Sequence, residues 1–235
     1  MEKPSIQRLC SYASSVYLSP SHPVSVQTQP PIGAFKVYGR QNYNYIQETV
    51  KALQAKAEHD ANPRLRPKPY DGKAGVFPCR TFNFGKQTVT LPHVDTKNLA
   101  QGWCSITPLG RFNHKQGGHL VLWDFGLVID FPPGSTILIP SSLFVHSNTP
   151  IQEEETRSSI VQYAAGGLVR WVNRGFQSDK DWMAKASAED QQRDQEKQKL
   201  RWVKAAGMYT KVEELTRQMG ACTGAQVTTS PAEYA

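Results

Sequence analysis

Apolar residues recur at helical spacing in YIQETVKALQAKAEHD, residues 45–60. Spacings of four, three and four residues gather them on one face of a helix, which consists of Ile46, Val50, Leu53 and Ala57. Asn42 is the predicted N-cap, and Asn62-Pro63 ends the helix. Residues 1–32 are rich in Ser, Pro and Gln, so we expect them to be irregular or partly disordered.

From about residue 76 to 171 the pattern alternates with a period of two, which is typical of strands. Short runs rich in Val, Ile, Thr and aromatic residues are FPCRTFNFG, QTVTLPHVD, WCSITPLG, HLVLWDFGLVIDF, STILIP, LFVHSN, RSSIVQYAAG and VRWV. Turn signals such as QGG, DFG and PPGS separate them. So many short strands without intervening helices predict a mainly β barrel, sandwich or jelly roll with flanking helices, an α+β class. The strand spacing also predicts a core containing Trp103, Trp123, Phe125 and Phe131.

Beyond Asn173 the composition turns to Lys, Glu, Asp and Gln. Ser187 and Asp190 form a capping signal for a helix, Gly207 ends the helical stretch, and KVEELTRQM predicts a short further helix. The apolar stripe expected on the longer helix consists of Leu200, Val203 and Trp202. The predicted organisation is therefore an N-terminal segment and helix (1–75), a β core (76–175) and a C-terminal helical extension (176–235), forming one compact domain.

Composition narrows the class of protein. With 39% apolar residues in 235 positions, the chain can bury one sizeable core, and its net charge of +7 favours polyanionic partners. Four cysteines form no CxxC pair, which is typical of reduced thiols in an intracellular protein. The N-terminus has no signal-peptide pattern, and no run of eighteen apolar residues occurs, so we expect no membrane association.

The stretch LPHVDTKN, residues 91–98, holds the first candidate chemistry. In a strand, His93 and Asp95 point to the same side, although an HxD pair alone is more often a surface or hydrogen-bonded pair. His146 follows 51 residues after Asp95, at the end of another predicted strand. Two histidines and one carboxylate are the ligand set of non-haem Fe(II) oxygenases, although His146 alone also fits a structural histidine of a barrel.

A candidate anion site follows eleven residues after His146. In the strand-like RSSIVQY, Arg157, Ser159, Val161 and Tyr163 share one face. A guanidinium with a hydroxyl two residues further on is suited to hold a carboxylate, such as the far end of 2-oxoglutarate. The alternative is an ion pair between Arg157 and the acidic loop at 153–155.

The region from about residue 81 to 176 resembles a known family. The segments PHVDTKNLAQGWCSITPLGRF, GGHLVLWDFGLVIDFPPGSTILIPSSLFVHSNTPI and QYAAGGLVRWVNRGF are similar to the fungal branch of the TET/JBP family of 2-oxoglutarate and Fe(II) dependent dioxygenases. These enzymes have a double-stranded β-helix core and oxidise methyl groups on DNA bases. The resemblance implies the following roles: His93, Asp95 and His146 bind iron, Arg157 and Ser159 bind the cosubstrate, Asn98 contacts a base edge, and Tyr163 stacks on a flipped base.

Two positions depart from the family pattern. Ala165 stands where methylcytosine oxidases carry a base-reading histidine, and Gln87 stands where fungal relatives carry arginine. The expected substrate is therefore either 5-methylcytosine or N6-methyladenine in DNA, oxidised with O2. The alternatives are an oxygenase of a protein or small molecule, and a non-catalytic binding module on the same fold.

The expected partner is DNA carrying a methylated base. We expect a monomer, because nothing in the sequence demands more, and a nuclear location, although the chain has no clear targeting signal. The DNA backbone contacts predicted nearest the core are Arg80, Lys97, Arg111 and Lys115, with a further basic cluster in PRLRPKP at 63–69.

Overall fold

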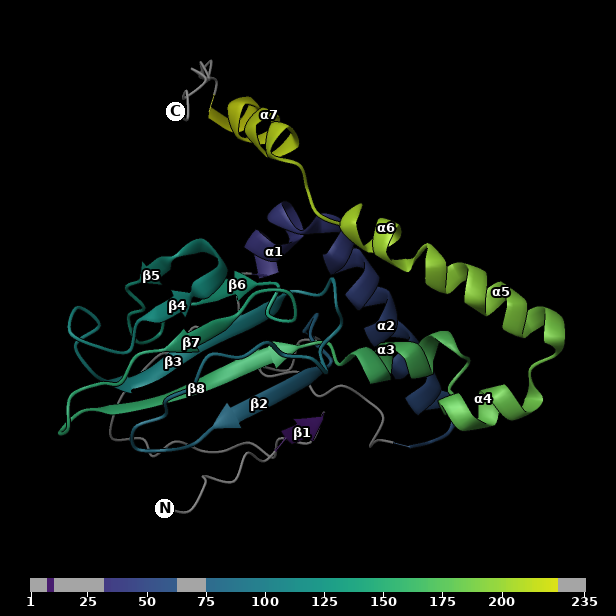
Figure 1. Ribbon diagram of the computed structural model, residues 1–235, viewed down its shortest axis with the longest axis horizontal. Coiled ribbons are helices and arrows are strands. Elements are labelled where there is room, and N and C mark those ends of the chain that lie inside the picture. The colour runs from purple at the N-terminus through teal and green to yellow at the C-terminus, as the bar shows by residue number, and fades with distance from the viewer. Residues whose placement is uncertain (1–7, 11–31, 63–74, 224–235) are drawn as a thin grey trace.

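Two antiparallel sheets form the centre of the molecule in the computed structural model, which describes residues 8–10, 32–62 and 75–223 (Figure 1). The larger sheet has the order β1 (Arg8–Cys10), β2 (Cys79–Asn83), β8 (Thr156–Tyr163), β3 (Cys104–Arg111) and β6 (Ile137–Ile139). The smaller sheet has the order β5 (Leu127–Ile129), β4 (Leu120–Leu122) and β7 (His146–Asn148). One core cluster joins the two sheets, with buried residues from β2, β3, β4, β6 and β8.

The strand order defines the fold. An isolated antiparallel bridge between His93 and His146 places the segment around His93 beside β7. Leaving out the short β1, we count β2 as the first strand and the His93 segment as the second, so that β3 to β8 keep their numbers. The larger sheet then has the order 1-8-3-6, and the smaller sheet has the order 2-7-4-5. This is the arrangement of a double-stranded β-helix, and with its flanking helices the fold confirms the predicted α+β class. The predicted domain boundaries stay a prediction.

The long N-terminal helix confirms its predicted apolar face. α2 (Arg40–His59) buries all four predicted positions. It begins two residues before the predicted cap, so the prediction for Asn42 was wrong: this side chain is buried within the helix and its Nδ2 donates to the Met208 carbonyl at 3.4 Å. The preceding helix α1 (Ile32–Tyr38) was not predicted.

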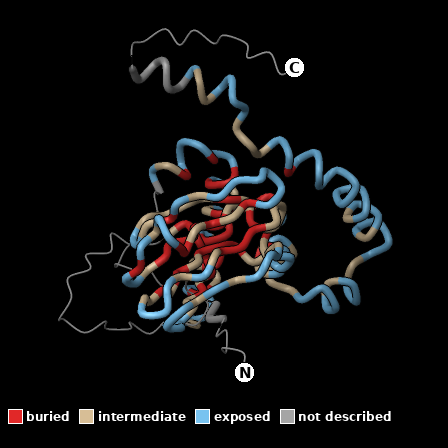
Figure 2. Tube along the Cα trace, turned by 60° about the vertical axis from the view of Figure 1, so that its left-hand side comes forward, coloured by how far each residue is buried: buried red, intermediate tan, exposed pale blue. Residues whose placement is uncertain are grey.

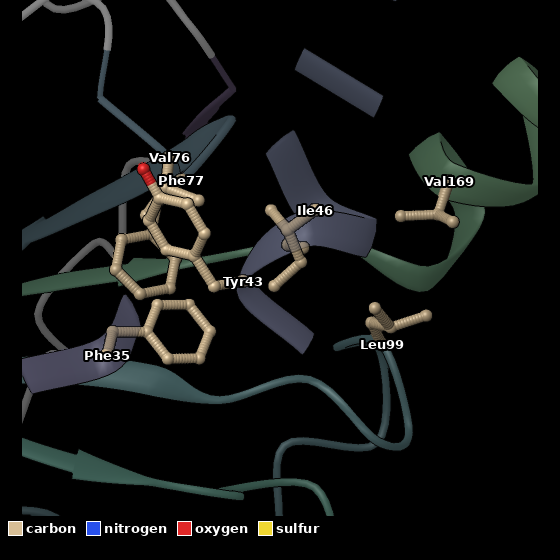
Figure 3. Packing of buried hydrophobic residues seen from close by; sticks show 8 residues of the cluster. Phe35, Tyr43, Ile46, Val76, Phe77, Leu99 and Val169 are labelled. Carbon is tan, nitrogen blue, oxygen red and sulfur yellow. The ribbon is translucent and has the colours of Figure 1, made fainter. Parts of the chain in front are cut away.

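A second core cluster fixes these helices to the sheets. The Phe35 ring of α1 stacks on Phe77 with centroids 5.4 Å apart and on Trp103 at 5.5 Å. Figure 3 shows Ile46 of α2 between this aromatic group and Val169. Burial of these apolar surfaces is the main force that holds the helices against the end of the β core.

The run VRWV, predicted as a strand, is helical. It lies in α3 (Gly166–Asn173), which follows directly after β8. A short apolar run cannot be assigned by periodicity alone, and here tertiary packing decides, because Val169 is buried in the cluster with α2. Gly166 allows a close approach, since a Cβ there would lie 3.3 Å from the Asn98 carbonyl oxygen.

The C-terminal helices form an arm that extends from α3 (Figure 1). They are α4 (Asp179–Lys185), α5 (Ala188–Lys199), α6 (Arg201–Ala206) and α7 (Val212–Thr223). The predicted capping box of Ser187 and Asp190 is present at the start of α5. The predicted apolar stripe was wrong, because Leu200, Trp202 and Val203 are each more than half exposed. Figure 2 shows this contrast between the buried sheets and the exposed arm.

Three other expectations need correction. QTVTLPHVD is not a regular strand, since it pairs only through isolated bridges at Gln87 and His93. Trp123 and Phe125 lie in a 3-10 turn and are 54% and 52% exposed, so they are not core residues, whereas Phe131 is buried as predicted. Within the segment expected to be irregular, residues 8–10 pair with β2.

The basic cluster at 63–69 lies outside the described residues. In the described part of the chain, no helix is long and apolar enough to span a bilayer.

Candidate metal centre and cavity

A cavity of about 470 Å³ opens between the two sheets. Its size lies within the range of small-molecule sites. Its walls include all seven residues predicted to bind metal, cosubstrate or base, namely His93, Asp95, His146, Arg157, Ser159, Asn98 and Tyr163. Residues that are far apart in the sequence thus line the same cavity.

His93, Asp95 and His146 form the candidate metal centre. Each offers one ligand atom, and these atoms all lie within 4.8 Å of one another. The Nε2 of His93 is 3.7 Å from Oδ1 of Asp95, and the two imidazole centroids are 4.4 Å apart. This donor set and spacing fit a divalent transition metal such as Fe(II).

Backbone carbonyls orient both imidazoles. The Nδ1 of His93 donates to the Leu91 carbonyl at 2.7 Å, and that of His146 donates to the Phe144 carbonyl at 3.0 Å. Because Nδ1 carries the proton in each ring, Nε2 is the free lone pair, which is the form that binds a metal. Burial lowers the pKa of His146, which also favours the neutral imidazole.

Three segments bring the ligands together. His146 is buried on β7, and reciprocal backbone hydrogen bonds of 3.1 and 3.0 Å join it to His93. Asp95 follows in a turn, where its amide donates to the Ser141 carbonyl at 2.9 Å. The two ligands of LPHVDTKN therefore converge through a bridge and a turn rather than through the alternation of one regular strand.

Arg157 lies on the opposite wall of the cavity from the small sheet, on β8, and is only 3% exposed. Its Nη1 donates to the Thr88 carbonyl at 3.0 Å, while its buried Nε has no hydrogen-bond partner among the described residues. No ion pair joins it to the acidic loop at 153–155 in that part of the chain. Burial lowers the pKa of Arg157 to about 10. A buried cation with an unused donor fits a bound carboxylate.

Ser159 and Tyr163 line the same wall at alternate positions of β8. Asn83 Nδ2 donates to the Ser159 hydroxyl at 3.0 Å, and the Thr81 hydroxyl donates to the Tyr163 oxygen at 3.3 Å. Tyr163 is 8% exposed and belongs to the core cluster, so its ring serves both the core and the cavity wall.

The two departures from the family pattern lie in different places. Ala165 lines the cavity, where it offers no polar side chain. Gln87 points elsewhere, because its Nε2 donates to the carbonyls of Gln152 and Glu153 at 2.9 and 2.7 Å. Gln87 therefore fixes the acidic loop, and its side chain is absent from the described cavity lining.

The four predicted DNA contacts are not equivalent. Among the described residues, Lys97 lines the cavity and the other three do not. Arg80 alternates with the cavity residue Thr81 on β2, so it points to the other face of the sheet, where its Nε donates to Gln162 at 3.0 Å. Arg111 is exposed at the end of β3, and Lys115 forms an ion pair with Asp130.

Asn148 is a site residue that the sequence reasoning missed. Its Oδ1 accepts hydrogen bonds from the Thr90 amide at 2.9 Å and the Thr90 hydroxyl at 2.8 Å, which ties residues 88–90 to β7. Thr88 in turn accepts from Arg157. Its position two residues after His146, on the same strand face, was the available signal.

The fold and the site define a double-stranded β-helix protein with a candidate metal centre. No protein-family model matches the chain, and a search of curated proteins finds no relative. A solved structure with some similarity is that of NgTET1 in complex with 5mC DNA, at 18% identity and a TM-score of 0.36. The match covers 50% of this chain and 41% of that chain, and it defines neither the activity nor the substrate of this protein.

Proposed function

We propose that the protein is an Fe(II) and 2-oxoglutarate dependent dioxygenase that oxidises a methyl group on a flipped base in DNA. One observation carries the proposal. The ligand atoms of His93, Asp95 and His146 lie within 4.8 Å of one another in a cavity that also contains the buried, partly unpaired Arg157. A metal ligand set beside a buried cation with an unused donor is what a metal with a carboxylate cosubstrate requires.

In this proposal the chain holds both groups. His93, Asp95 and His146 bind Fe(II), and Arg157 with Ser159 holds the far carboxylate of 2-oxoglutarate. A carboxylate there would accept from the free Nε of Arg157 and offset the cost of burying its charge. Fe(II), 2-oxoglutarate and O2 together supply the oxidising chemistry, while the protein positions the substrate and excludes water.

A base inside a duplex cannot reach a cavity between two sheets, so the target nucleotide must flip out. Tyr163 offers an aromatic ring on the cavity wall, and Lys97 offers a cation for a phosphate. Ala165 provides no side-chain hydrogen bond to a base. The proposed substrate is therefore either 5-methylcytosine or N6-methyladenine, and with a DNA substrate we also propose a nuclear location.

The test is anaerobic reconstitution with Fe(II) and 2-oxoglutarate, followed by O2 and oligonucleotides that each carry one methylated base. Mass analysis of the nucleosides should detect an oxidised or demethylated base with the wild type and none with His93→Ala. His59→Ala is the matched control, because His59 is exposed on α2 far along the chain from the site. Product formation by His93→Ala, or no product from any modified DNA, would contradict the proposal.

An alternative, an oxygenase acting on a protein or small molecule, is favoured by one observation. Only Lys97 of the four predicted backbone contacts lines the cavity in the described part of the chain. Fluorescence anisotropy with a methylated duplex at several salt concentrations separates the two. A DNA enzyme should bind with an affinity that falls steeply with salt. Decarboxylation of 2-oxoglutarate without DNA binding would favour the alternative, and binding of DNA without turnover would favour a non-catalytic module.

A further inference from the structure

The two oxygens of the Asp95 carboxylate have different surroundings. Oδ1 faces the His93 imidazole, 3.7 Å from Nε2. Oδ2 accepts a hydrogen bond from the Asn98 amide at 3.0 Å. A carboxylate can only accept, so the Asn98 amide must present its NH2 group to Asp95, which fixes the orientation of the amide. One oxygen is thus free for a metal while the other is occupied.

Both hydrogens of the Asn98 amide nitrogen are used. The second goes to the Ser141 hydroxyl at 3.2 Å. Asn98 would have to break one of these bonds to donate to a base, so its side chain could contact a base only as an acceptor, through Oδ1. The backbone of Asn98 is also held. Its backbone N–H donates to the Asp95 carbonyl at 2.9 Å, and the residue forms an isolated β-bridge with Ala165.

Ser141 connects both partners. It is 1% exposed and follows β6, and its carbonyl accepts from the Asp95 amide at 2.9 Å while its hydroxyl accepts from Asn98. The Ser141 side chain also interacts with the buried Cys104 thiol.

We propose that Asn98 and Ser141 form a clamp that holds Asp95 as a ligand through Oδ1 alone and withholds Oδ2 from the metal. Asn98 is then a positioning residue, in place of the base-contacting role that the family resemblance implies. This inference rests on the proposed metal centre. Its physical advantage is that a carboxylate limited to one oxygen occupies one coordination position and leaves the others for cosubstrate and O2.

Loss of the clamp should weaken metal binding. Replacing groups that orient a metal ligand costs about 10- to 100-fold in affinity, so Asn98→Ala should raise the Kd for Co(II) by about that factor. Ser141→Ala should raise it less, because the hydrogen bond from Asn98 to Asp95 survives. Thr96→Ala is the control, since it lies in the same turn and its side chain makes no hydrogen bond among those of the described residues.

The experiment is a Co(II) titration of the metal-free full chain, followed by visible absorption and equilibrium dialysis. A double-mutant cycle with Asp95→Ala isolates the contact, because Asn98→Ala should add little once the carboxylate is gone. DNA affinity of the metal-free protein should be equal in the wild type and Asn98→Ala. Thermal unfolding checks that each variant folds. If Asn98→Ala does not fold, Asn98→Ser, which keeps a small hydrogen-bonding group, replaces it.

The outcomes separate the two proposals. Weaker Co(II) binding by the Asn98 variant with unchanged DNA affinity supports the clamp. An unchanged Kd for Co(II) with weaker DNA binding overturns the clamp and restores Asn98 as a base contact, while the metal centre stands. Wild-type protein that binds no Co(II) overturns the metal centre and the clamp together.

Discussion

Arg157 is a buried cation whose Nε has no hydrogen-bond partner among the described residues. Without a carboxylate partner among the described residues, its guanidinium bears a desolvation cost, which is why burial lowers its pKa. Such a residue is expected to weaken the stability of the ligand-free protein and to strengthen ligand binding.

Arg157→Gln should therefore separate stability from binding. We expect the 2-oxoglutarate KM to rise by at least about 30-fold, because removal of one partner of a buried charge pair costs about 2 kcal/mol or more. The Tm of the ligand-free protein should change little, because the burial cost of the charge is removed while the hydrogen bond to Thr88 and the contact with the Phe112 ring are lost. Steady-state kinetics and calorimetry check this, with the exposed Arg111→Gln as the matched control. A lower Tm with unchanged KM would mean that Arg157 is structural.

Tyr163 lies in both the core and the cavity wall, so its two roles need different variants. Tyr163→Phe keeps the ring and should keep turnover on a base. Tyr163→Leu keeps an apolar side chain but loses the stacking surface, and kcat/KM should fall about 5- to 150-fold, in line with about 1–3 kcal/mol per stacked base. Co(II) affinity should not change in either variant. Equal kcat/KM for the wild type and Tyr163→Leu would leave Tyr163 with a core role alone.

At the scale of elements, the C-terminal arm returns to the β core near the site. Tyr209 follows α6, and its hydroxyl donates to the Gln101 carbonyl at 3.0 Å. The Asn42 side chain of α2 donates to the Met208 carbonyl. Gln101 lies three residues after Asn98, in the turn that follows the candidate metal ligands. These contacts connect the arm, α2 and that turn.

Tyr209→Phe should lower the stability of the protein by about 1 kcal/mol, the usual worth of one hydrogen bond, which corresponds to a Tm lower by about 2–4 °C. Partial burial raises the pKa of Tyr209 to about 12, so the unfolded state ionises first as the pH rises above 10. The wild type should therefore lose stability between pH 10 and 12 by a term that Tyr209→Phe lacks. Denaturation curves at several pH values measure both effects, with Tyr38→Phe, exposed on α1, as the control.

Element assignments depended on how far packing overrides local pattern. The spacing of the apolar residues in α2 was sufficient to predict the helix, because an apolar stripe of this length fits a helix and no other element. The short VRWV was not, since its helix is stabilised by Val169 in contact with α2, a partner distant in sequence. The metal-ligand segment also failed as a strand, because one bridge and one turn position its side chains.

At the scale of the whole molecule, one sheet edge is apolar and exposed. β5 ends the smaller sheet in the described part of the chain, and Val128 and Leu127 are 65% and 50% exposed. An exposed apolar edge strand is a site for association with other chains. The expected monomeric state is therefore most at risk at this edge.

Val128→Lys should reduce association without affecting the site, because a charge on an edge strand opposes further strand pairing. We expect a lower apparent mass by light scattering at high protein concentration and an unchanged Kd for Co(II). Gln195→Lys, on the exposed arm, adds the same charge and controls for the effect of net charge. If the wild type stays monomeric throughout and Val128→Lys changes nothing, the edge is protected.

The sequence by itself determined the alternating strands, the long amphipathic helix and the candidate ligands His93, Asp95, His146 and Arg157. These depend on local spacing and on the chemistry of single side chains, which the order of residues records directly. The tertiary structure alone decided which oxygen of Asp95 is free, because Ser141, which holds Asn98, lies 43 residues further along the chain. It also decided that Arg80 faces away from the cavity, because the packing of the two sheets determines which face of β2 points inward.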